Sequence, residues 1–247
     1  MKSTMWRILI VILILPSVAI TRDKIRPQKE VIFFAGKQRV YYTFAQPSSS
    51  ESMPMILLLH GSGRDGMSQI NEWEGLARKE GIILVAPNSA NSAEWVGGTD
   101  GPEFLRDVIE AVQKKYPVDS RRLYLFGHSG GASFGMYMGM LESQYFAAVA
   151  VHAGTLQKDS DVFTFAQRKI PIAIWSGTLD QFFPLDQVRS TRDILNSHGF
   201  RAQLFEMPGH DHDYYQVAGE VNKEAWAFLK QNILDEEPEW RDIKWSR

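Results

Sequence analysis

The sequence of 247 residues contains no cysteine. This absence excludes disulfide bonds, thiolate catalysis and metal sites built on cysteine. It does not decide the cellular compartment, because an exported protein can fold without disulfides. The chain also has little net charge, −2 at pH 7, so nothing favours nucleic acid or another polyanion as a partner.

The N-terminal segment has the order of features that is typical of a signal peptide. Lys2 and Arg7 flank the start of an apolar run, and Ser17 and Ala19 occupy the small positions of a cleavage site. The run is shorter than the ~20 residues that a membrane-spanning helix needs. We therefore predict that residues 1–19 are a signal peptide and that the mature protein is exported, to the periplasm or the medium, without stable membrane insertion. An uncleaved membrane anchor is the alternative.

Repeats, low-complexity blocks and long linkers are also missing from the rest of the sequence. The length suits one large α/β domain. We therefore expect a single catalytic domain over residues 28–234, followed by a charged tail over residues 235–247.

Short apolar runs and helical patterns alternate along this domain. A strand hairpin is expected over residues 30–47, with its turn at Gly36. Further strands are expected within residues 55–61, 81–88, 122–128, 146–154, 170–178 and 201–209, and helices within 101–117, 185–199 and 216–234. This alternation predicts an α/β fold with a mostly parallel central sheet and helices on both faces. In such sheets, binding and catalytic sites form beyond the carboxyl ends of the strands.

Residues 127–131 read Gly-His-Ser-Gly-Gly and follow one of the apolar strands. They fit the pattern G-x-S-x-G, in which a serine lies on a sharp turn between a strand and a helix. The alternative is a glycine-rich turn with a capping serine. The strand before the motif and the helix-forming residues after it favour Ser129 as a nucleophile.

A serine hydroxyl needs a base and a group that orients the base. Where the nucleophilic serine lies on such a turn, the acid comes after the serine along the sequence, and the histidine comes after the acid. Asp180 comes soon after a strand and is the favoured acid, whereas Asp186 precedes a helix and is interpreted as its N-cap. His210 and His212 lie in the loop after the last strand, and the residues alone leave both open as the base. Because they are two residues apart with no second cluster, we expect no metal site there, and no cofactor is required.

The tetrahedral intermediate of acyl transfer needs N–H donors for its oxyanion. The residue after the nucleophile, Gly130, supplies the first. The loop "HGSGRDG", which follows an early strand, supplies the second from the N–H of Ser62. Trp95 and His152 also follow strands, and we expect them either to contact substrate or to pack in the core.

Taken together, these motifs resemble the α/β-hydrolase superfamily over residues 55–229. The closer resemblance is to exported esterases related to polyhydroxybutyrate depolymerases and to feruloyl or acetylxylan esterases. It rests on "LLLHGSGRDG", "LYLFGHSGGA", "SGTLDQFFP" and "HDHDYYQVAGEV". A segment similar to Asp-His-x-Tyr-Tyr carries the catalytic histidine in S-formylglutathione hydrolases, and this resemblance selects His212.

The sequence therefore predicts a serine hydrolase that cleaves carboxylic esters through an acyl-enzyme, with Ser129, His212 and Asp180 as its triad. Its expected substrate is a small-molecule or polymer-borne ester. The alternatives are a peptidase of the prolyl oligopeptidase type and a non-catalytic binding module on a hydrolase scaffold.

Overall fold

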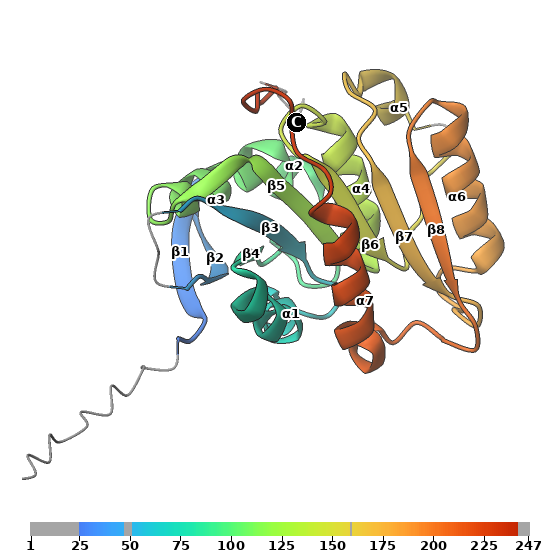
Figure 1. The fold of residues 1–247 in the computed structure, drawn as a ribbon, viewed down its shortest axis with the longest axis horizontal. Helices are drawn as coiled ribbons and strands as arrows, with labels where there is room; N and C mark the ends of the chain where they lie inside the picture. The colour runs from blue at the N-terminus through green and yellow to red at the C-terminus, as the bar shows by residue number, and fades with distance from the viewer. Residues whose placement is uncertain (1–24, 47–50, 159, 242–247) are drawn as a thin grey trace, which may run out of the picture.

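A computed structural model describes residues 25–46, 51–158 and 160–241, and their central feature is an eight-stranded sheet (Figure 1). The strands are β1 Gln28–Phe34, β2 Lys37–Phe44, β3 Met53–Leu59, β4 Ile83–Pro87, β5 Val118–His128, β6 Ala148–His152, β7 Ile172–Gly177 and β8 Ala202–Met207. Their order is β1-β2-β4-β3-β5-β6-β7-β8. The β1–β2 and β2–β4 pairs are antiparallel and all other neighbours are parallel. The prediction of a mostly parallel sheet is confirmed, as is the hairpin that opens it.

Helices cover both faces of the sheet because its central strands are apolar on both sides. The helices are α1 Gly66–Glu80, α2 Gly97–Asp100, α3 Pro102–Gln113, α4 Gly130–Leu141, α5 Val162–Phe165, α6 Leu185–Ser197 and α7 Tyr214–Leu229. In β3, Leu57 and Leu59 join the core under α3, α4 and α6, whereas Ile56 and Leu58 join the core under α1 and α7. The two-residue period of the strand thus supplies two separate hydrophobic cores.

Helix α1 is not among the helices expected from the sequence, although its residues carry the signals of a helix. Asp65 caps the helix by accepting a hydrogen bond from the N–H of Ser68, and Gly81 ends it in the left-handed conformation, with φ of 69°. Within the helix, Ile70 and Trp73 are fully buried at a spacing of three residues. A polar cap, a glycine stop and this spacing together are typical of an amphipathic helix.

The C-terminal segment packs against the domain as far as the structure describes it. Trp240 lies edge-on to Tyr145, with ring centroids 4.5 Å apart. The backbone N–H of Arg241 donates to the carboxylate of Glu142 at 2.9 Å. The expected signal peptide, residues 1–19, and the end of the tail from residue 242 lie outside the described residues. No helix in the described part of the chain is long and apolar enough to span a membrane.

Candidate active site

Ser129 lies on the turn between β5 and α4, in a conformation that non-glycine residues rarely adopt. Its φ is 56° and its ψ is −121°. Its N–H donates to the carbonyl of His152 at 3.0 Å, which ties the turn to the end of β6. Strained backbone of this kind persists only where the surrounding structure holds it, and such residues cluster at functional sites. The hydroxyl is consequently presented beyond the carboxyl edge of the sheet, at the N-terminus of α4.

Two glycines allow this turn to be so tight. A Cβ at Gly127 would lie 2.2 Å from the carbonyl oxygen of Gly131, and a Cβ at Gly131 would lie 2.3 Å from the carbonyl oxygen of Leu59. Neither position has room for a side chain. The spacing of glycines in the motif therefore follows from the close approach of α4 to β3 and β5.

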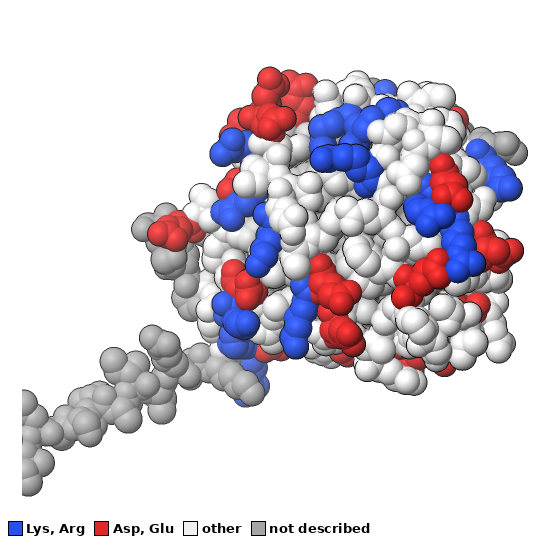
Figure 2. All heavy atoms as spheres, turned by 45° about the vertical axis from the view of Figure 1, so that its right-hand side comes forward, with Lys and Arg blue, Asp and Glu red and all other residues white. Residues whose placement is uncertain are grey.

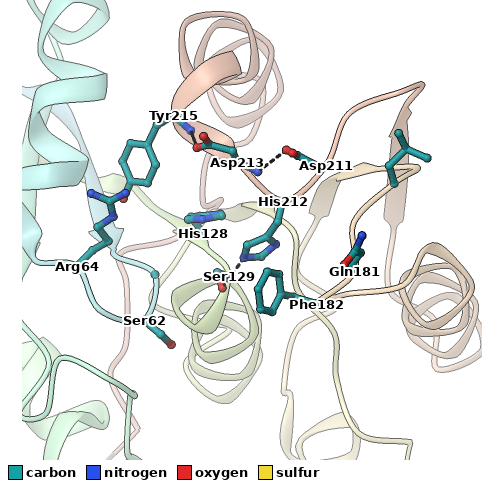
Figure 3. A pocket seen from close by; sticks show the side chains of 12 residues that line it. Ser62, Arg64, His128, Ser129, Gln181, Phe182, Asp211, His212, Asp213 and Tyr215 are labelled. Carbon is teal, nitrogen blue, oxygen red and sulfur yellow. Dashed lines mark hydrogen bonds between the residues drawn. The ribbon is translucent and has the colours of Figure 1, made fainter.

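His212 connects Ser129 to Asp180, and Figure 3 shows the part of this link between His212 and Ser129. Its Nε2 is 3.0 Å from the Oγ of Ser129, and its Nδ1 is 2.8 Å from the Oδ2 of Asp180. A carboxylate only accepts hydrogen bonds, so Nδ1 carries the proton and Nε2 is free to accept the hydroxyl proton. The structure thus brings together the three side chains that the sequence analysis selected as a triad.

The acid is held by the loop that follows β7. The Oδ1 of Asp180 accepts hydrogen bonds from the N–H groups of Phe182 and Phe183, both at 2.9 Å, and its side chain is fully buried. The rings of the same two phenylalanines flank the imidazole of His212, at centroid distances of 4.8 and 5.6 Å. One short loop therefore orients the carboxylate and encloses the histidine.

The two expected oxyanion donors, Ser62 and Gly130, are neighbours. A Cβ built on Gly130 would lie 3.9 Å from the backbone nitrogen of Ser62, and one built on Gly61 would lie 3.3 Å from the Cβ of Ser129. Gly130 is the first residue of α4, where N–H groups have no partner within the helix. The loop that carries Ser62 therefore lies beside the turn that carries Ser129 and Gly130.

The competing residues lie elsewhere. The ring of His210 faces His152, with centroids 5.5 Å apart, rather than Ser129. Asp186 belongs to the first turn of α6, whose N-cap position is Pro184, so the interpretation of Asp186 as the N-cap is wrong by two residues. It borders a separate surface depression together with Arg189.

Of the two positions expected for His152, the structure places it in the core. It is completely buried, and its Nδ1 is 3.2 Å from the Nδ1 of His128, which lies against His212 with ring centroids 5.0 Å apart. Burial lowers the pKa of His128 to about 3 and that of His152 to about 2, so both are neutral at physiological pH. This neutral pair packs behind the ring of His212.

Trp95 is partly buried and packs against neighbouring residues of the domain. Its Nε1–H donates to the carbonyl of His60 at 2.8 Å, and its ring stacks on Phe134 at 5.2 Å. It is not part of the wall of the pocket at Ser129, which agrees with packing, the second of the two expectations for this residue.

The pocket at Ser129 has a volume of about 510 Å³ and is open to solvent. Its rim includes the strongly exposed side chains of Leu179 and Phe182, and opposite them Arg64 lies over the ring of Tyr215 at 4.6 Å (Figure 3). The walls consist of Gly61, Ser62, Arg64, His128, Ser129, Leu179, Gln181, Phe182, Asp211, His212, Asp213 and Tyr215. The sequence patterns indicate the reacting groups but not this rim, because its members come from two loops and the first turn of α7.

Comparison with known proteins gives the family. The signature of the Dienelactone hydrolase family matches residues 98–235, more than half of the chain. The chain belongs to the dienelactone hydrolase family. The resemblance to α/β-hydrolase esterases that the sequence motifs indicated is thereby confirmed, and with it membership in a hydrolase family of esterase type.

One curated relative of this protein is named as an esterase. The bifunctional acetylxylan esterase/xylanase XynS20E of Neocallimastix patriciarum is 30% identical over 159 residues, which are 62% of this chain and 23% of that protein. The chain thus spans about a quarter of the length of this curated relative.

Two solved structures share the fold. The CE1 ferulic acid esterase AmCE1/Fae1A of Anaeromyces mucronatus has a TM-score of 0.63 and 20% identity, covering 80% of this chain and 89% of the other. The fluorophosphonate-binding serine hydrolase FphF of Staphylococcus aureus has a TM-score of 0.70 and 13% identity, covering 83% and 98%.

Proposed function

We propose that the protein is a serine esterase that cleaves carboxylic esters through an acyl-enzyme on Ser129. The observation that carries this proposal is the continuous hydrogen bonding from the hydroxyl of Ser129 through His212 to Asp180, at 3.0 and 2.8 Å. This arrangement turns an ordinary alcohol into a nucleophile, because the imidazole can take its proton as the new bond forms.

In the first half of the proposed reaction, the Oγ of Ser129 attacks the ester carbonyl and its proton passes to the Nε2 of His212. Asp180 stabilises the imidazolium, and the N–H groups of Ser62 and Gly130 bind the oxyanion. The protonated His212 then gives its proton to the leaving alcohol. In the second half, His212 deprotonates water, the water attacks the acyl-enzyme, and the carboxylic acid leaves as Ser129 regains a proton.

Two further proposals concern the substrate of the protein and the cellular location of the protein. The relatives named for acetylxylan and ferulic acid esterase activity suggest short acyl and aromatic acyl esters as the first substrates to test. The N-terminal sequence, with its charged start and small residues before position 20, supports export of the mature protein.

Turnover of 4-nitrophenyl acetate, and of a panel of esters that differ in acyl length and aromaticity, tests the proposed function. Ser129→Ala and His212→Ala should each lower kcat by at least about 10³-fold, whereas His210→Ala should retain most of it. A binding module would show no turnover above that of Ser129→Ala. Faster cleavage of a proline-containing peptide amide than of every ester would favour the peptidase alternative. An equal effect of the two histidine substitutions would contradict the assignment of the base.

A further inference from the structure

His60 ends the apolar run of β3 and immediately precedes the loop that carries Ser62. It is almost completely buried, with 1% of its surface exposed, and it takes no part in the proposed proton transfers. Buried polar side chains of this kind are costly unless they are hydrogen bonded. Its contacts are therefore informative about what it does.

The hydrogen bonds of His60 fix its tautomer. The backbone N–H of Ser89 donates to Nε2 at 3.1 Å. The hydroxyl of Ser89 lies 3.2 Å from the same nitrogen and donates its proton to the carbonyl of Asn91 at 2.8 Å. A ring nitrogen that accepts from an amide carries no proton, and burial lowers the pKa of His60, which keeps the ring neutral. The single ring proton is therefore on Nδ1, which lies 2.8 Å from the carbonyl oxygen of Gly61.

That carbonyl belongs to the same peptide unit as the N–H of Ser62. A trans peptide is planar, so its C=O and N–H point in opposite directions and turn together. The oxygen of Gly61 accepts a second hydrogen bond from the N–H of Arg64 at 3.1 Å, which closes a tight turn with Gly63 at φ of 74°. Holding this oxygen therefore sets the direction of the Ser62 N–H.

We propose that His60 is a positioning residue, whose Nδ1–H holds the Gly61–Ser62 peptide so that the Ser62 N–H faces the oxyanion. This inference rests on the proposed function. Preorganised donors stabilise a transition state best when they need no reorientation during the reaction. The histidine thus contributes to catalysis through a backbone amide and without touching the substrate.

The imidazole is itself held from behind by the loop after β4. Trp95 donates to the carbonyl of His60 at 2.8 Å and lies against its ring, with centroids 4.8 Å apart. Asp100, completely buried and paired with Arg39, accepts the backbone N–H groups of Ala90 and Val96 at 2.8 and 2.9 Å. These contacts anchor the segment that presents the Ser89 amide to His60, so the ring cannot turn away from Gly61.

Two substitutions separate positioning from simple packing. The amide nitrogen of asparagine reaches the place of Nδ1, whereas the amide of glutamine reaches the place of Nε2. His60→Gln keeps a partner for Ser89 but loses the donor to Gly61, so we expect kcat for 4-nitrophenyl acetate to fall about 10- to 100-fold with KM little changed. His60→Asn keeps that donor and should recover most of kcat. A histidine that only filled the core would give both variants the same kcat and a similar loss of thermal stability.

A third variant tests the same peptide without disturbing the core. Ser62→Pro removes the N–H itself at an exposed turn position where proline is favoured, and kcat should fall about 10²- to 10³-fold. In this background His60→Gln should cause no further loss of kcat, because the group it orients is gone. Independent, multiplicative losses would overturn the proposed role of His60, as would a Gln variant that is as active as the wild type. An inert wild-type protein would instead overturn the proposed function, and this inference with it.

Discussion

At the scale of single residues, Asp180 shares its two oxygens between two tasks. Oδ2 accepts the proton-bearing Nδ1 of His212, and Oδ1 accepts the N–H groups of Phe182 and Phe183. Because both oxygens are occupied, the carboxylate cannot turn without breaking backbone contacts. The geometry of the acid is therefore set by the loop between β7 and α6 in which it lies.

Asp180→Asn should lower kcat by about 10³- to 10⁴-fold while leaving the melting temperature close to that of the wild type. The amide carbonyl can still accept the two loop N–H groups, but its NH₂ would face His212 and favour the tautomer with the proton on Nε2. Steady-state kinetics measure the fall in kcat, and thermal melts of the same preparation measure the melting temperature. A kcat within tenfold of the wild type would contradict the assignment of Asp180.

The histidines of the site show which features of single residues can be predicted from the sequence and which cannot. A histidine after a strand is placed correctly at the edge of the sheet, as His152 is, but the strand pattern does not say whether it faces the pocket or the core. His210 and His212 lie in the same loop, and only the path of that loop decides which of the two side chains faces Ser129. Resemblance to related enzymes, rather than spacing, selected the histidine that the structure places beside Ser129.

At the scale of elements, most strands and their parallel pairing could be predicted because buried strands read as continuous apolar runs. The elements that escaped prediction are the four-residue helices α2 and α5, which are too short to show a period, and those with a mixed pattern. α1 carries polar residues between its few buried ones, and the first residues of β5 are only partly buried. The loops that shape the pocket rim have no periodic pattern at all, so their positions depend on the sheet that carries them.

Glycine substitutions test how tightly α4 meets the sheet. Gly127→Ala should destabilise the protein by about 1–3 kcal/mol, because its Cβ would meet the backbone oxygen of Gly131 at 2.2 Å. Gly219→Ala is the matched control: this glycine is exposed within α7 with nothing within 4 Å of the added Cβ. It should be neutral or stabilising, by up to about 1 kcal/mol. Denaturant unfolding of both variants makes the comparison, and equal stabilities would contradict the packing described.

At the level of the whole molecule, the charges nearly balance, with 27 Lys and Arg residues against 29 Asp and Glu residues. Acidic and basic side chains lie interspersed on the face shown in Figure 2, in keeping with the net charge of −2.

The C-terminal segment packs over one buried acid, Glu142. This residue is 1% exposed and accepts a hydrogen bond from the backbone N–H of Arg241 at 2.9 Å. Burial raises the pKa of Glu142 to about 7, so its carboxyl group is a cost to the fold when it is ionised.

This shift predicts a pH dependence of stability. The carboxyl group has a pKa near 4.5 in the unfolded chain and about 7 in the folded one, so the folded state binds more protons between these values. Its contribution to the free energy of unfolding is therefore complete below pH 4.5 and is lost as the pH rises through 7. Glu142→Gln should raise the melting temperature relative to the wild type more at pH 8 than at pH 4.5. The exposed Glu220→Gln is the control, and an identical pH response of both variants would contradict the prediction.

We have proposed that Ser129 is a nucleophile that its partners activate in the folded protein. Reaction with a fluorophosphonate, followed by intact-mass and peptide mass spectrometry, tests this activation without a natural substrate. We expect a single adduct per chain, located on Ser129, with none on Ser129→Ala and strongly slowed labelling of His212→Ala. An adduct on another residue, or a folded wild-type protein that does not react, would contradict it.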